Sequence, residues 1–169
     1  MSTSPPVRPF TDAYLLSYST EHVQYEFDMF LWSVEMCSRR GTTIGASSQQ
    51  HLTRLKNILV ESSVIHLRNL IDFFYLPSPQ PTDIIAADFF SSPSHWVSVR
   101  PLISAALDKA RVRANKEIAH LTTDRLAGAP PEKYWDVLAI AGEIRPLMNL
   151  LVQHADGKRL SASVAAVIR

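Results

Sequence analysis

Proline and glycine divide this chain into a few long stretches whose apolar residues recur every three or four positions. The clearest stretch covers 48–75, where one face carries leucine, isoleucine and phenylalanine and three prolines follow at once. Helical patterns with their own breaks extend over three other ranges, namely 19–40, 101–125 and 132–154. No alternation of apolar and polar residues is long enough to build a sheet. The sequence therefore predicts an all-α, single-domain bundle of four main helices.

The segments outside these four helices are expected to play lesser roles. Residues 1–18 form an N-terminal arm, with a shorter helical piece from Thr11 to Tyr18, and residues 157–169 form a C-terminal tail. The helical bundle itself occupies 19–156. A short irregular insertion separates the second and third helices, and its aromatic residues are expected to cover the core. Pro146 should kink or split the last helix.

Composition excludes several classes of protein. With 17 basic and 16 acidic residues the net charge is +1, so no global basic field attracts nucleic acid, and RNA binding needs a local patch. The single cysteine, Cys37, excludes an intramolecular disulfide and is expected to be a small buried apolar residue. No run reaches the length of a membrane span, and no signal core follows Met1, so a cytoplasmic location is expected.

The first long helix is apolar on two faces. Opposite the stripe that should enter the core lies a second one, formed by Tyr25, Met29, Trp32 and Met36. Such a helix is either central in the domain or in contact with a second subunit. Of these two arrangements we expect the homodimer, with Trp32 as its anchor.

Several ionisable groups occur together near residue 115, within the third predicted helix. Arg113, Glu117 and His120 fall within about one third of the helix circumference, at 100° per residue. Histidine transfers protons near neutral pH, and arginine stabilises charge that develops at phosphorus. Arg113 and His120 thus suffice in principle for metal-independent RNA cleavage. Lys116, and Arg68 on the second helix, are the expected RNA-binding residues.

The alternative is a structural role for the same groups. Glu117 lies in the middle of an apolar stripe, where an unpaired carboxylate would be very costly. His66 and Asn69, three residues apart on the second helix, are the expected partners of the face formed by Arg113, Glu117 and His120. In this interpretation the polar network only fixes how two helices pack.

No cofactor or metal site is expected. Glu117 and His120 form a single Glu-x-x-His unit, whereas di-iron bundles carry two. No glycine-rich phosphate loop is present.

The segment from Arg113 to His120 resembles the Arg-x4-6-His signature of HEPN-like proteins, with Asn115 as the polar residue between them. The spacing here, Arg-x6-His, is the widest form. The resemblance implies a compact helical bundle, usually dimeric, and in many members a metal-independent endoribonuclease of a toxin–antitoxin or defence type. An antitoxin partner and RNA would then be its ligands. The alternative function is a non-catalytic helical interaction module.

Overall fold

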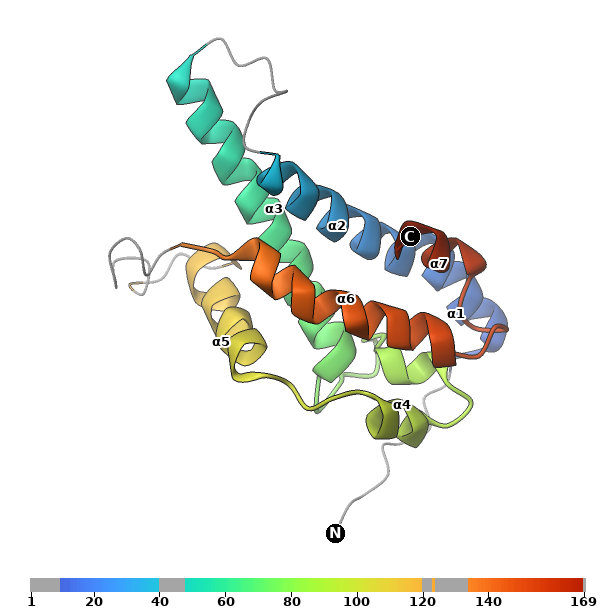
Figure 1. The fold of residues 1–169 in the computed structure, drawn as a ribbon. Helices are drawn as coiled ribbons and strands as arrows, with labels where there is room; N and C mark the ends of the chain where they lie inside the picture. Colours follow the sequence, from blue (N-terminus) through green and yellow to red (C-terminus); the bar gives the residue numbers. More distant parts are fainter. Residues whose placement is uncertain (1–9, 40–47, 120–122, 124–133, 169) are drawn as a thin grey trace.

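The computed structural model describes residues 10–39, 48–119, 123 and 134–168 (Figure 1). These residues form helices and connecting segments and contain no strand, which confirms the all-α prediction. The helices are more numerous than the four predicted. In order they are α1 (Asp12–Tyr18), η1 (Ser19–Val23), α2 (Gln24–Ser38), α3 (Gln49–Tyr75), η2 (Ala86–Phe89), α4 (Pro93–Val99), α5 (Ala105–Arg113), η3 (Ala114–Ala119), α6 (Val137–His154) and α7 (Ala162–Ile168).

The first three segments follow one another without a break. The predicted helix start at Ser19 is wrong, because Ser19 is fully buried inside a wide π-helical turn, η1, that joins α1 to α2. The hydroxyls of Ser19 and Thr20 both donate to the carbonyl of Leu16, at 2.9 Å. Such back-bonding competes with the regular helical hydrogen bonds and bends helices. Residues 10–18 of the predicted arm are thus part of the fold, since Leu15 is buried in the core.

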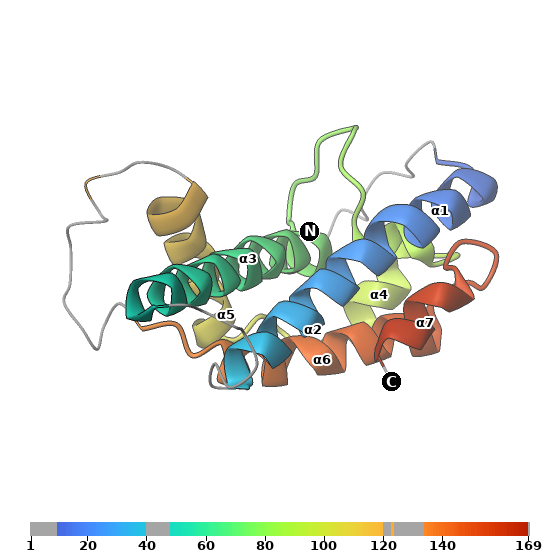
Figure 2. The same cartoon turned by 90° about the horizontal axis from the view of Figure 1, so that it is seen from above.

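Helix α3 has the predicted bounds. Ser48 caps it by accepting a hydrogen bond from the backbone nitrogen of His51 at 3.3 Å, and it ends two residues before Pro77. It packs along α2 in the opposite direction (Figures 1 and 2). Between the two helices the buried hydroxyl of Ser63 donates to that of Ser33 at 3.0 Å.

The core lies where α2, α3 and α6 meet one another. Each helix contributes large side chains that are at most 2% exposed; these are Phe27, Phe30, Leu67, Ile71, Ile144 and Leu147. The insertion after α3 closes one end of this core with three buried aromatic residues, as predicted: Phe89, Phe90 and Trp96. The Trp96 indole also donates to the carbonyl of Phe74 at 3.1 Å.

The last helices differ from expectation in their limits. Helix α5 begins after Ser104 and not at Pro101, because the Ser104 hydroxyl caps the backbone nitrogen of Leu107 and also bonds Glu143 of α6. Helix α6 continues through Pro146 as one helix. The expected tail forms α7, which buries Val164 against α2 and α6. None of the described helices has the length and apolar character needed to cross a membrane.

Candidate functional site

The segment that carries the Arg-x6-His motif is a wide helical turn. Helix α5 ends at Arg113, and the chain continues as the π-helix η3, which packs against α3. π-helical turns are rare and occur frequently at functional sites. His120 lies outside the described residues, so only the first part of the motif can be placed.

Arg113 is held by its neighbours. Its Nε and Nη2 atoms both donate to the Glu117 carboxylate at 2.9 Å, which is the bidentate pair that their spacing in one helix allows. The guanidinium lies 4.1 Å from the centre of the Trp135 ring, and Nη1 donates to the carbonyl of Tyr134 at 3.4 Å. Arg113 is therefore turned toward the start of α6.

Asn115 faces a different helix. Residues two apart in a helix point in nearly opposite directions, and the Asn115 side chain accepts a hydrogen bond from Nε of Arg68 on α3. One turn away, Asp72 of α3 lies 3.9 Å from Arg111 of α5, which also binds Asp108 at 3.0 Å. We call Arg68 and Arg111, together with Lys116, which follows Asn115 in η3, the basic junction. Of the three guanidinium nitrogens of Arg68, only Nε has a hydrogen-bond partner among the described residues.

The predicted contact of His66 and Asn69 with the Arg113 face is wrong. Both residues bind Glu26 of α2: Nδ1 of His66 donates to one carboxylate oxygen at 2.8 Å and Nδ2 of Asn69 to the other at 3.2 Å. The reason is helix orientation, since this face of α3 packs against α2 while the face of Arg68 meets η3. The expected single network is thus two separate ones.

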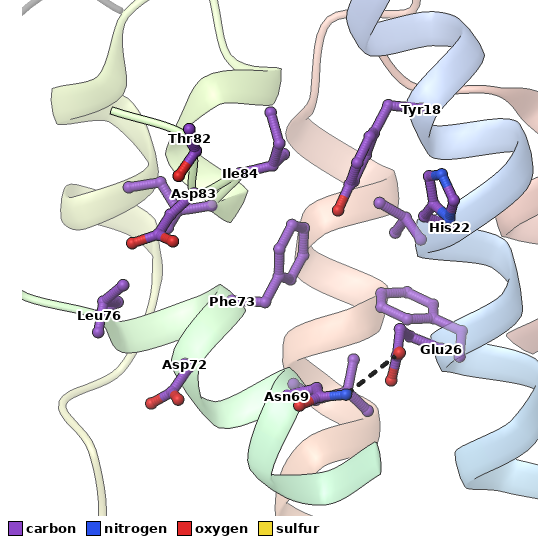
Figure 3. A pocket seen from close by; sticks show the side chains of 14 residues that line it. Tyr18, His22, Glu26, Asn69, Asp72, Phe73, Leu76, Thr82, Asp83 and Ile84 are labelled. Carbon is purple, nitrogen blue, oxygen red and sulfur yellow. Dashed lines mark hydrogen bonds between the residues drawn. The ribbon is translucent and has the colours of Figure 1, made fainter. Parts of the chain in front are cut away.

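Glu26 is the residue that the sequence interpretation missed. It follows Tyr25 between the two apolar stripes of its helix, and the edge of the Tyr25 ring meets His66 at a centroid distance of 5.7 Å. The sequence does contain one signal for Glu26: it is an ionisable residue on a helix that is apolar on two faces. Next to Glu26 the structure has a cavity of about 540 Å³, bordered by η1, α2, the end of α3 and residues 82–85 (Figure 3).

The second apolar face of α2 is partly open. Tyr25 and Trp32 are 53% and 48% exposed, whereas Met29 and Met36 are half-buried. Two isoleucines of α3, Ile58 and Ile65, are also about half exposed, at 59% and 47%. One face of α2 is therefore buried in the core and the other is partly exposed, so α2 is not a fully buried central helix in the described part of the chain.

Among the described residues, no three histidine, cysteine, aspartate or glutamate side chains form a group that could hold a metal ion. No model of a known family, no curated protein and no solved structure matches this chain.

Proposed function

We propose that this chain is a HEPN-like helical bundle that binds and cleaves RNA without a metal ion, at the basic junction. One observation carries the proposal: Arg68 of α3 binds Asn115, the polar residue of the Arg-x6-His segment. This contact holds two arginines, Arg68 and Arg111, beside the segment that leads to His120. A local cluster of cations is what a chain of nearly neutral net charge requires in order to bind a phosphate backbone.

The proposed reaction uses the substrate's own 2′-hydroxyl as the nucleophile. His120 takes the hydroxyl proton, the oxygen attacks the adjacent phosphorus, and the bond to the 5′-oxygen breaks as that oxygen takes a proton from water, which yields a 2′,3′-cyclic phosphate and a 5′-hydroxyl. Arg113 is occupied by Glu117 and Trp135, so we assign it to positioning of η3. Arg68, whose other guanidinium nitrogens have no hydrogen-bond partner among the described residues, is the better source of charge stabilisation at phosphorus.

Self-association is a further part of the proposal. Tyr25 and Trp32 of α2 and Ile65 of α3 are exposed apolar residues, and a second copy would cover them. A dimer would also double the number of cationic groups available to one RNA. An antitoxin that covers the basic junction is the expected regulator, and the reaction would take place in the cytoplasm.

The test compares RNA binding and cleavage by purified variants in EDTA. We expect His120→Ala to retain RNA binding and to lose cleavage by about 10² to 10⁴-fold, the usual contribution of a proton-transfer group. Arg68→Ala should lose both binding and cleavage. Arg54→Ala is the matched control, because Arg54 is exposed on the same helix, 14 residues or about 21 Å away. Wild-type protein that neither binds nor cleaves RNA would refute the proposal.

A non-catalytic interaction module is the second candidate, favoured by the engaged state of Arg113. A guanidinium with a bidentate carboxylate partner and an aromatic ring beneath it is typical of a structural pair. In that case variants of the basic junction would change the stability of the fold and leave RNA unaffected.

A further inference from the structure

The cavity beside Glu26 has the features of a small-molecule site. Its volume, about 540 Å³, is within the usual range for ligand pockets. One of its edges is η1, the π-helical turn that carries His22 and Val23. Figure 3 shows the ring of Phe73 in the middle of the group, with Tyr18 and Glu26 on one side and Asp83 on the other.

Aromatic and aliphatic side chains form much of the wall. Phe73 and Tyr18 offer ring surface, and five aliphatic residues add to it: Val23, Leu70, Leu76, Ile84 and Ile85. The Tyr18 hydroxyl has no hydrogen-bond partner within the described part of the chain. Burial, together with nearby Tyr14 and Glu26, raises the pKa of Tyr18, so the hydroxyl remains protonated at neutral pH and can donate or accept a hydrogen bond. These walls suit a ligand with an apolar body.

The charges around the cavity are negative. Three elements each supply one carboxylate: Glu26 from α2, Asp72 from α3 and Asp83 from the segment after it. Among the described residues that line the cavity there is no lysine and no arginine. Asp72 lies 3.9 Å from Arg111, which also binds Asp108. An anionic ligand would be repelled here, and a cation would be attracted.

Two side chains of α3 fix the Glu26 carboxylate in position. His66, which is 9% exposed and does not line the cavity, and Asn69 each bind one of its oxygens. A carboxylate has about four acceptor positions, so two remain for a ligand. Such preorganisation lowers the entropic cost of binding.

We propose that this cavity binds a small organic cation, an amine attached to an apolar body. The ammonium group lies among the carboxylates of Glu26 and Asp72, and the body lies against Phe73 and Tyr18. Aromatic faces add to the attraction for the cation. This site adjoins the basic junction at the contact of Asp72 with Arg111, but its occupancy does not depend on RNA cleavage.

Isothermal titration calorimetry of the full chain with 2-phenylethylamine tests the proposal. We expect saturable binding at one site, and at least about tenfold weaker binding of 2-phenylethanol, which has the same body without the charge. Asp72→Asn should weaken amine binding about tenfold, and Glu26→Gln is a second variant with the same expectation. Asp28→Asn is the matched control, since Asp28 is exposed on α2 and does not line the cavity.

Two results would overturn the proposal. One is the absence of saturable amine binding at millimolar concentration by wild-type protein whose circular dichroism shows a folded helical chain. The other is equal binding of the amine and the alcohol, or equal loss in the Asp72 and Asp28 variants. Either outcome leaves the proposed RNA chemistry untouched, because that depends on His120 and on Arg68, which does not line the cavity.

Discussion

The pair of Arg113 and Glu117 provides a quantitative test of whether Arg113 has a structural role. We expect Arg113→Ala to remove two charge-assisted hydrogen bonds and the contact with the Trp135 ring. Glu117→Ala removes the same hydrogen bonds but keeps the ring contact. The double variant then completes a thermodynamic cycle that isolates the energy of the pair.

The magnitude follows from burial. The two side chains are 20% and 26% exposed, so the pair lies between a surface ion pair, worth about 0.2–1 kcal/mol, and a buried one, whose disruption costs about 3–5 kcal/mol. We expect Arg113→Ala to lower the free energy of unfolding by about 2 kcal/mol and Glu117→Ala by about 1.5 kcal/mol, with a coupling energy of about 1 kcal/mol. For a chain of this size, the arginine variant should then melt about 4–8 °C lower.

Urea unfolding measures these energies, with tryptophan fluorescence as the signal because Trp135 lies under the guanidinium. Arg113→Lys should restore little, since a lysine cannot form the bidentate pair. A coupling energy below about 0.3 kcal/mol would refute the structural assignment of Arg113. It would return this residue to the group of catalytic candidates.

Three further predictions concern other parts of the fold. Arg159→Ala should cost about 2 kcal/mol in urea unfolding, because this guanidinium binds Asp12 at 2.7 Å and also two backbone carbonyls of the insertion; a loss within error would show that these contacts are dispensable. Burial raises the pKa of the Cys37 thiol, so less thiolate exists at pH 8 and iodoacetamide should react more slowly with folded than with urea-unfolded protein; equal rates would contradict this. Trp32→Glu should convert the proposed dimer to a folded monomer in light scattering, and a monomeric wild type at micromolar concentration would end the dimer proposal.

The helices that the sequence predicts best are those with local signals at both ends. Helix α3 has a serine cap at Ser48 and a proline soon after Tyr75, and its bounds agree with the prediction. The predicted start of α5 at Pro101, a residue typical of the first turn of a helix, is wrong, because Ser104 caps the helix. Ser104 also bonds Glu143 of α6. This contact joins residues far apart in the sequence, so the local sequence around Ser104 does not predict it.

The same distinction applies to the candidate site. The contact of Arg113 with Glu117 follows from a spacing of four residues within one helix, so the sequence predicts it. The contact of His66 with Glu26 joins residues 40 positions apart. It depends on which face of α3 meets α2, and both faces of α3 carry polar residues. The sequence therefore indicates which side chains need partners but not which helix supplies them.

The central proposal is tested most directly by the ends of the RNA that the protein produces. A 5′-labelled single-stranded RNA is incubated with purified wild-type protein in EDTA, and the products are resolved beside those of His120→Ala and Arg54→Ala. We predict fragments with 2′,3′-cyclic phosphate ends from the wild type and the Arg54 variant, and intact RNA with the His120 variant. Intact RNA with all three proteins, or cleavage that survives the loss of His120, would contradict the proposal.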